Sequence, residues 1–259
     1  MPELPDLEIF AANLEKRFKN KLLEHIEVPV TRKLNVSVAE LKNALEGHKL
    51  LAVNREGKTI QLHFGEGNVL GIHLMLHGEL RFLGEDKEVK YPIVALHFKG
   101  EEGFALTDFQ KAATPTFNPA PSDVPDALSD QMSSQYLEEL LAKKKAPVKS
   151  VLMDQKVIRG IGNTYADEIL WAAKISPMSV SKAIPKDKVK VLHKEIGAVL
   201  RKEITQIRSK LPDELGGEIK EFLKIHGAGI SKSPTGKEIL VTEIGGRKTY
   251  YTDEQELFE

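Results

Sequence analysis

The chain has 259 residues, 41% of them hydrophobic, and a formal net charge of −1. This length can bury one large core or two modest ones, and we take two domains as the working count. The absence of cysteine excludes disulfides, a thiolate nucleophile and a cysteine-based zinc site, and the eight histidines show no close pairing, so we expect no metal and no cofactor. A charge near zero argues against a protein that coats nucleic acid indiscriminately.

The apolar residues form no run of the length that a membrane span needs, and the first residues are proline and acidic rather than basic and then apolar. We therefore expect a protein without a membrane partner, located in the cytoplasm.

A helix is predicted almost at the N-terminus. Pro5 suits a first helical turn, and apolar residues follow at helical spacing. They are Leu4, Leu7, Phe10, Leu14 and Phe18.

From residue 50 to 108 the pattern changes to short alternating, β-rich runs separated by glycines. The runs cover residues 59–64, 69–76, 79–83, 93–98 and 104–109. They predict an antiparallel sandwich or barrel.

Residues 114–130 contain four prolines among small and acidic residues, a composition typical of a linker. We place the domain boundary there: a first domain over 1–113, a linker over 114–132 and a helical domain over 133–226. Helices are predicted within residues 134–145, 148–155, 164–174, 186–209 and 218–225. The last part, 227–259, contains two β-like runs around Ile244-Gly245-Gly246-Arg247, which predict a hairpin.

Pro2 is the first candidate for chemistry. Removal of Met1 would expose a secondary amine with an ordinary pKa near 8, so far more of it is unprotonated at neutral pH than of a lysine. Such an amine can attack a sugar C1′ and form an iminium, and the Glu3 carboxyl beside it is suited to moving protons. The plain alternative is that Pro2 and Pro5 only start a helix. If Met1 is retained, the Pro2 nitrogen is an amide and is not nucleophilic.

Lys58 is a lone lysine that follows Gly57 at the entry to a predicted strand. The commoner reading of such a residue is an exposed lysine at a strand edge. Spacing alone does not decide between this reading and a role for Lys58 in the chemistry.

Residues 143–168 contain the most specific pattern. Five lysines and Arg159 stand against Asp154 alone between 143 and 159, which predicts a strip that faces phosphates. Gly160 and Gly162 then allow a tight turn, and Asn163 is placed to cap a second helix whose N-terminus suits a phosphate. The alternatives are a solvated helix face and an ordinary helical hairpin.

These residues resemble the formamidopyrimidine-DNA glycosylase and endonuclease VIII family of base-excision repair enzymes. The resemblance runs from Pro2-Glu3-Leu4-Pro5 through the Lys58 strand and residues 73–80 to the helix–two-turn–helix stretch that ends near Pro177. It implies an α+β fold, with an N-terminal β-sandwich that carries the first helix, a C-terminal helix–two-turn–helix domain, and DNA bound in the cleft between them.

The resemblance also implies roles for single residues. Pro2 matches the Schiff-base nucleophile and Glu3 the general acid, and Lys58 matches a strand lysine that contacts DNA and assists catalysis. Asn163 after Gly162, and Lys149 on the preceding helix, match residues that grip phosphates near the lesion, and Arg159 lies in the same basic strip.

Two departures from the family pattern bear on function. Members commonly end in a four-cysteine zinc finger with an arginine for phosphate contact and elimination, whereas residues 245–250 look like that hairpin without its metal. We expect a zincless finger held by hydrophobic packing, with Arg247 in the arginine role.

The opposite-base contacts also differ, because an arginine and a phenylalanine of the 8-oxoguanine enzymes are replaced within Asp108-Phe109-Gln110-Lys111-Ala112. The segment after Gly216 looks too short for the loop that closes over 8-oxoguanine. Oxidised pyrimidines, or ring-opened and further-oxidised purines, are the favoured lesions.

Leu76 matches the position of a side chain that fills the gap left by the expelled base, with His77 beside it as a further DNA contact. The alternative for Leu76 is a buried strand residue. The expected partner is double-stranded DNA with an oxidised base or an abasic site, bound by a monomer.

Two other functions stay open. A catalytically silent relative would recognise damaged or bent DNA, and the missing arginine and phenylalanine with the near-neutral charge favour it. A ribosome-associated protein that shares only the helix–turn–helix would need no Pro2-Glu3 and would be far more basic.

Overall fold

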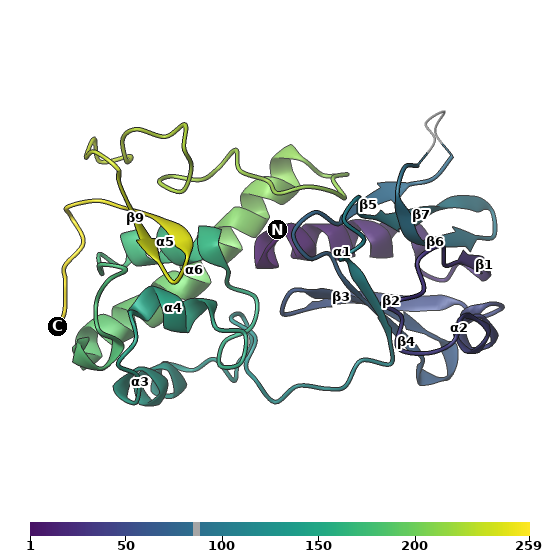
Figure 1. The fold of residues 1–259 in the computed structure, drawn as a ribbon, viewed down its shortest axis with the longest axis horizontal. Helices are drawn as coiled ribbons and strands as arrows, with labels where there is room; N and C mark the ends of the chain where they lie inside the picture. The colour runs from purple at the N-terminus through teal and green to yellow at the C-terminus, as the bar shows by residue number, and fades with distance from the viewer. Residues whose placement is uncertain (85–88) are drawn as a thin grey trace. The chain divides into compact units, whose positions relative to one another are not determined.

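The computed structural model describes residues 1–84 and 89–259. Its contacts divide the chain into two compact units (Figure 1). Unit 1 comprises Met1–Pro121 and Ile207–Ile219, and unit 2 comprises Ser122–Gln206 and Lys220–Glu259. The chain therefore returns to its first unit after residue 206, which the predicted boundary did not anticipate.

Helix α1 (Leu4–Phe18) is confirmed and begins where Pro5 predicts. Asp6 accepts a hydrogen bond from the backbone N–H of Glu3 at 2.8 Å, which satisfies one of the free donors at the start of a helix. The apolar face is buried, and the ring of Phe18 stacks on Phe98 and tilts against Phe104 at centroid distances of 4.7 and 5.4 Å. These contacts fix α1 on the strands beneath it.

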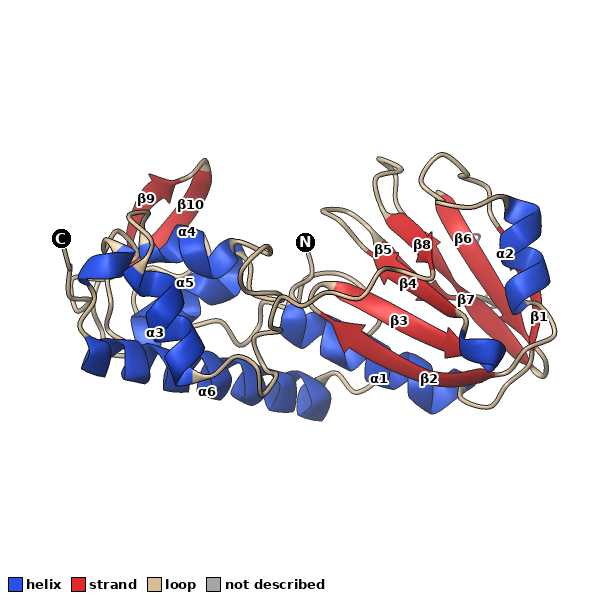
Figure 2. Cartoon of the chain, turned by 90° about the horizontal axis from the view of Figure 1, so that it is seen from below, coloured by secondary structure: helices blue, strands red, loops and turns tan. Residues whose placement is uncertain are grey.

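Unit 1 contains the predicted antiparallel sandwich of two four-stranded sheets (Figure 2). One sheet has the order β1 (Leu23–Glu27), β6 (Pro92–Phe98), β7 (Glu101–Thr107), β5 (Glu79–Phe82). The other has the order β2 (Leu50–Glu56), β3 (Thr59–Phe64), β4 (Val69–His73), β8 (Thr114–Phe117). Alternate residues of β3 are buried, as expected for a strand with one face on the core.

Strand β8 corrects the predicted linker, which was expected to begin at residue 114. Pro115 pairs opposite Ile72 of β4, and β8 is the last strand of its sheet. An edge strand tolerates a residue without an N–H, so proline does not exclude it. Helix α2 (Val38–Leu45) was also not predicted, although Ser37 caps it by accepting from the Glu40 N–H.

Unit 2 contains four of the five predicted helices: α3 (Ser134–Ala142), α4 (Val148–Met153), α5 (Asn163–Ala172) and α6 (Lys186–Lys210), whose last turn belongs to unit 1. Short 3-10 turns are found at η1 (Gly65–Gly67) and η2 (Ser181–Ala183). In the described part of the chain, no helix is both long and apolar enough to cross a lipid bilayer.

The helix predicted over 218–225 is wrong. The N–H groups of Lys224, Ile225 and His226 donate to the Glu168 carboxylate at 2.8 to 3.1 Å, and the N–H of Ile219 donates to Asp6. Side-chain carboxylates thus take the donors that a helix would use internally.

The C-terminal hairpin is confirmed as β9 (Leu240–Ile244) and β10 (Arg247–Tyr251). Gly245 and Gly246 join the strands with φ values of 58° and 73°, the left-handed pair that a two-residue hairpin turn requires. Beside it, Trp171, Ile225 and Tyr250 form an apolar cluster with Ile239.

Candidate active site and nucleic-acid interface

The start of α1 is buried and held by a carboxyl group. Pro2 and Glu3 are both buried, and Asp6 accepts from the N–H of Glu3 through Oδ2 and from the N–H of Ile219 through Oδ1. Burial raises the pKa of Asp6 to about 7. A carboxyl group with a pKa near neutrality is therefore hydrogen-bonded to the backbone of the proposed general acid.

The segment after α6 adds a second carboxylate at the chain end. Glu218 forms an ion pair with the amino group of Met1, and Asn13 donates to the carbonyl of Glu214 at 2.8 Å. Both contacts lie within unit 1. The N-terminus is thus set among acidic groups.

Lys58 is buried, with 8% exposure, which corrects the reading of it as an exposed strand-edge lysine. The turn that carries it needs Gly57, whose φ is 59°. Arg55 donates to Glu8 of α1 at 2.8 Å and to the carbonyl of Gly57 at 3.0 Å. The Lys58 turn is therefore tied by Arg55 to the helix that begins at the proposed nucleophile.

His73 is a titratable neighbour of Lys58 that responds to its charge. Burial first, and then the charge of Lys58, lower the pKa of His73. Its Nδ1 accepts from the Met75 N–H at 3.1 Å, so the ring is neutral and protonated at Nε2. His73 can therefore donate but does not add a positive charge beside Lys58.

Leu76 lies in a turn after β4 and is 56% exposed, so its reading as a buried strand residue is wrong. The His77 ring, next to it, lies 4.9 Å from the ring of Phe109, which is 58% exposed. Asp108 holds the Phe109 turn, because its carboxylate accepts from the N–H groups of Gln110, Ala112 and Ala113, each at 2.8 Å. Apolar and aromatic groups are thus presented to solvent on fixed turns.

The basic strip of unit 2 is divided between the surface and the interior. Lys143, Lys145 and Lys156 are exposed, whereas Lys149 is fully buried and its Nζ lies 2.8 Å from Oδ1 of Asp167. A phosphate cannot reach an ammonium in that position, so the expected phosphate role does not fit Lys149 as it lies in this fold.

Arg159 is also used within the unit. It is half-buried, and its Nε donates to the carbonyl of Val124 at 2.7 Å. The backbone N–H of Arg159 donates to Pro125 and its carbonyl accepts from Ala127. Arg159 therefore anchors the start of unit 2.

The glycine turn leads into α5 as predicted, but with one difference. Gly160 takes a φ of 102°, Gly162 is the cap, and Asn163 is already the first helical residue. The Asn163 side chain donates to the carbonyl of Lys248 at 3.1 Å instead of capping α5. The start of the helix and the hairpin are joined by this bond.

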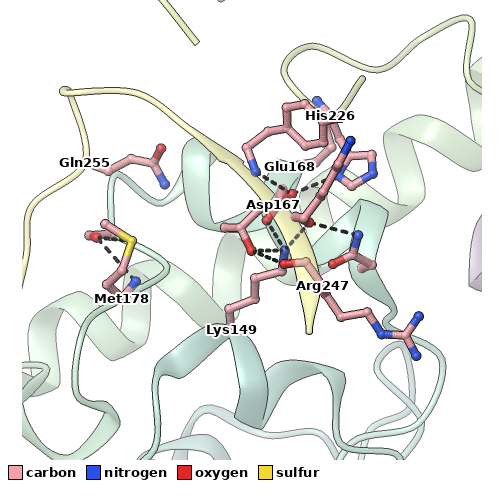
Figure 3. A network of polar contacts seen from close by, with 12 residues as sticks. Lys149, Asp167, Glu168, Met178, His226, Arg247 and Gln255 are labelled. Atoms are coloured by element: carbon pink, nitrogen blue, oxygen red, sulfur yellow. Dashed lines mark hydrogen bonds and ion pairs between the residues drawn. The ribbon is translucent and has the colours of Figure 1, made fainter. Parts of the chain in front are cut away.

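Arg247 begins β10 next to the glycine turn and is exposed. Figure 3 shows its side chain directed away from the buried polar network behind it. A guanidinium at the tip of a hairpin is accessible to an anion, and the role of Arg247 stays a prediction.

The structure places the predicted site residues in two groups. Unit 1 holds Pro2, Glu3, Lys58, Leu76 and His77. Unit 2 holds Lys149, Arg159, Gly162, Asn163 and Arg247.

Sequence reasoning missed Asp6, Phe109, Asp167 and His226. Asp6 carries a signal, since an acidic residue three positions after a cap is half of a capping box. Asp167 and His226 pair over a long sequence separation, which no local pattern reveals. Within the described residues, no group of three or more histidine and acidic side chains is arranged to hold a metal ion.

Comparisons with known proteins cover almost the whole chain. Residues 1–114 match the model of the formamidopyrimidine-DNA glycosylase N-terminal domain, and residues 124–212 match that of the formamidopyrimidine-DNA glycosylase H2TH domain. A formamidopyrimidine-DNA glycosylase of Carboxydothermus hydrogenoformans is 30% identical, covering 97% of this chain and 98% of the relative. One of Lactococcus lactis is 29% identical, covering 97% of each chain.

Solved structures agree. The complex of Lactococcus lactis Fpg with DNA that contains an abasic site superimposes with a TM-score of 0.85 at 26% identity, over 96% of this chain and 97% of that one. The complex of the Lactococcus lactis protein with FAPY-dG-containing DNA gives 0.85 at 25% identity, over 96% and 98%.

Proposed function

Because the chain belongs to the formamidopyrimidine-DNA glycosylase family, we propose that it is a base-excision repair enzyme that removes oxidised bases from double-stranded DNA. We further propose that it cleaves the strand at the resulting abasic site, acting as a lyase through Pro2. The observation that carries the proposal is the buried Pro2-Glu3 start of α1, to which Arg55 ties the turn that carries Lys58. Its place in the cell would be the nucleoid, where the substrate is.

The chemistry begins once Met1 is removed. The unprotonated Pro2 nitrogen attacks C1′ of the damaged nucleotide, a C–N bond forms, and the bond from C1′ to the base breaks. The nitrogen then loses its proton, and cleavage of the C1′–O4′ bond opens the sugar ring and leaves an iminium cation. Because proline is a secondary amine, this cation has no proton on nitrogen to lose and stays charged. The carboxylates near the chain end stabilise that positive charge.

Glu3 handles the protons of this reaction. It gives a proton to the sugar ring oxygen as the ring opens, and the resulting carboxylate is suited to accept a 2′ proton during elimination, when the 3′ phosphate leaves. Lys58 places a cation beside the reacting nucleotide, where a phosphate or the developing oxyanion would be stabilised.

Before C1′ of the sugar can be attacked, the damaged base must leave the base stack, which costs about a few kcal/mol. Leu76 supplies an exposed apolar side chain that can fill the vacated space. The His77 and Phe109 rings, tilted against each other, extend that surface with aromatic groups. We propose that these three residues together fill the gap.

Phosphate binding falls to unit 2. The N-terminus of α5 at Gly162-Asn163 presents the positive end of a helix dipole. Arg247 adds a full charge on the neighbouring hairpin, which the Asn163 side chain contacts through Lys248. The exposed lysines of the basic strip add long-range attraction.

For the lesion, we propose oxidised pyrimidines or ring-opened and further-oxidised purines. The turn after β7 offers Gln110 and Ala112 rather than an arginine and a phenylalanine opposite the lesion. A solved structure of a relative in complex with FAPY-dG DNA supports ring-opened purines as one class.

The test is base release from duplexes that carry dihydrothymine, a ring-opened guanine, a hydantoin, 8-oxoguanine or an abasic site. The Met-trimmed chain is compared with a form that keeps an N-terminal extension, in which Pro2 is an amide. We expect release and strand nicking only with the free N-terminus. Tight binding to damaged DNA with no release by either form would instead establish a catalytically silent DNA-binding protein.

A further inference from the structure

Behind the hairpin lies a buried polar cluster that the proposed chemistry does not use. It joins α4, α5, residues 220–226 and β10, all within unit 2 (Figure 3). At its centre the side chains of Lys149 and Asp167 have no solvent exposure, and their Nζ and Oδ1 atoms lie 2.8 Å apart. Burying two charges costs desolvation energy, and apolar side chains of similar size often serve stability as well or better. The pair is therefore best explained by what it positions.

Lys149 holds the hairpin at the residues that follow Arg247. Its Nζ donates to Oγ1 of Thr249 at 2.8 Å and to the carbonyl of Lys248 at 3.2 Å. The Thr249 hydroxyl in turn donates to the carbonyl of Arg247 at 3.2 Å. The ammonium thus fixes the backbone immediately after Arg247.

Asp167 holds the other side of the same strand. Its Oδ2 accepts from the N–H of Tyr250 at 3.0 Å and lies 2.7 Å from Nδ1 of His226. The His226 ring packs edge-on against the Tyr250 ring at 4.8 Å. In a two-stranded sheet the outer edge of β10 has no third strand, so the Asp167 carboxylate takes that place.

The carbonyl oxygen of Lys248 joins the hairpin to the proposed phosphate site. The carbonyl of Lys248 accepts from Lys149 and also from the Asn163 side chain at 3.1 Å. A slip of β10 by one residue would turn Arg247 to the opposite face, and apolar packing of Tyr250 on Trp171 and Ile225 gives little directional resistance to it. Directional bonds to three consecutive residues do resist it.

We propose that Lys149, Asp167 and His226 form a clasp that positions Arg247 and the start of α5 as one phosphate-binding unit. In this chain without cysteine, the clasp sets the register of the hairpin. Lys149 is then a positioning residue and not a phosphate ligand. The part of this inference that concerns DNA binding rests on the proposed function, whereas the part that concerns the structure of the hairpin does not.

The first experiment is a double-mutant cycle of Asp167→Asn and Arg247→Ala, read as affinity for an abasic duplex. Asn has nearly the shape of Asp but leaves the Lys149 ammonium buried without its carboxylate. Each change should weaken binding by about tenfold or more, the range for a lost hydrogen bond to a charged group. The double variant should bind the duplex at most about twofold more weakly than the weaker-binding single variant, because both changes remove the same contact. Effects that multiply would overturn the clasp, and so would unchanged or tighter binding by Asp167→Asn, the result expected if Lys149 were a phosphate ligand.

The second experiment is amide hydrogen exchange of the free protein, which needs no DNA. Asp167→Asn should lose protection over residues 247–251 while β3 and β4 of unit 1 keep theirs. His226→Phe keeps an aromatic ring against Tyr250, so it carries the test if Asp167→Asn disturbs all of unit 2. Lys156→Met, an exposed lysine of the same basic strip, is the matched control and should leave exchange unchanged.

The two experiments distinguish a failure of the clasp from a failure of the proposed function. Unchanged protection of residues 247–251 in both Asp167→Asn and His226→Phe would overturn the clasp. A wild-type protein that binds no abasic DNA would contradict the proposed function and the phosphate-binding part of this inference, even if protection still depended on Asp167.

Discussion

Single side chains on the surface of unit 1 are proposed to fill the gap that the expelled base leaves. Leu76 is exposed on its turn, and the Phe109 ring, on a turn held by Asp108, is tilted against the ring of His77. Because Leu76 and Phe109 are more than half exposed, truncating either of them should cost the free protein little stability.

We expect Leu76→Ala and Phe109→Ala each to slow excision of a paired lesion by about tenfold, the scale of one lost base–side chain stacking contact. Cleavage of a single-stranded abasic oligonucleotide, which needs no gap-filling, should stay within about twofold of wild type, the scatter of such assays. Leu51→Ala, which also truncates an exposed leucine of unit 1, is the control. Equal losses on both substrates would argue against a gap-filling role.

At this scale the sequence is informative about residue types but not about burial. Lys149 and Lys156 lie seven positions apart in one basic run, yet one is in the interior and the other is at the surface. The difference depends on Asp167, which is brought to Lys149 only by the packing of α4 against α5. Lys58 could not be assigned for a similar reason, because the turn that carries it is tied to α1 through Arg55, a contact that no local pattern reveals.

Among the elements, α6 contains a carboxyl group whose protonation should control stability. Burial, and then the charge of Glu168, raise the pKa of Glu203 to about 7 from an ordinary value of 4.5. The Glu168 carboxyl group accepts the N–H groups of residues 224–226, and its charge opposes ionisation of the neighbouring Glu203.

The sign of the pH effect follows from this shift. Between pH 4.5 and 7 the folded protein binds more protons at Glu203 than the unfolded chain, so stability falls as the pH rises through that range and then levels off. Asp6 adds a parallel fall, from 3.8 to about 7. Glu203→Gln should therefore flatten the dependence in part and raise the melting temperature at pH 8.

Thermal unfolding at pH 5, 6, 7 and 8 measures this. Glu195→Gln, the same change at a half-buried position of α6, shows what the loss of one charge on the helix does by itself. A Glu203→Gln variant that melts below wild type at pH 8 would show that the ionised carboxylate is stabilising, which is incompatible with a pKa raised by burial.

Elements with strong local signals could be predicted, and elements that depend on distant partners could not. Helices α1 and α6 have long apolar periodicity, and the hairpin has its Gly-Gly turn, so all three were found. The segment 218–225 has a helical pattern, yet Glu168 and Asp6 draw its N–H groups away. Strand β8 was missed because prolines mask an edge strand whose pairing with β4 is decided by the sheet.

For the whole molecule, the net charge of −1 means that DNA affinity must come from a few local contacts. Binding should still weaken with salt, and Arg247→Ala should reduce the slope of log affinity against log salt by about 0.9, the value for one phosphate contact in duplex DNA. Lys237→Ala removes a charge from the same C-terminal region, where Lys237 already faces Asp253 at 3.3 Å, and should leave the slope unchanged. A slope that does not respond to Arg247→Ala would remove Arg247 from the phosphate contacts.

The two-part architecture could be predicted from composition, because β-rich and helical patterns occupy different halves of the chain. The return of Ile207–Ile219 to unit 1 could not, since it depends on bonds from residues 214 and 219 to α1. That return matters for function because it sets Glu218 beside the chain end.

The most direct test of Pro2 as the nucleophile is borohydride trapping of the Met-trimmed protein on an abasic duplex, followed by mass mapping of the adduct. We predict a covalent species whose reduced sugar remnant is attached to the nitrogen of Pro2, and no such species when an N-terminal extension makes that nitrogen an amide. An adduct on a lysine such as Lys58, or efficient trapping by the extended form, would contradict the assignment of Pro2 as the nucleophile.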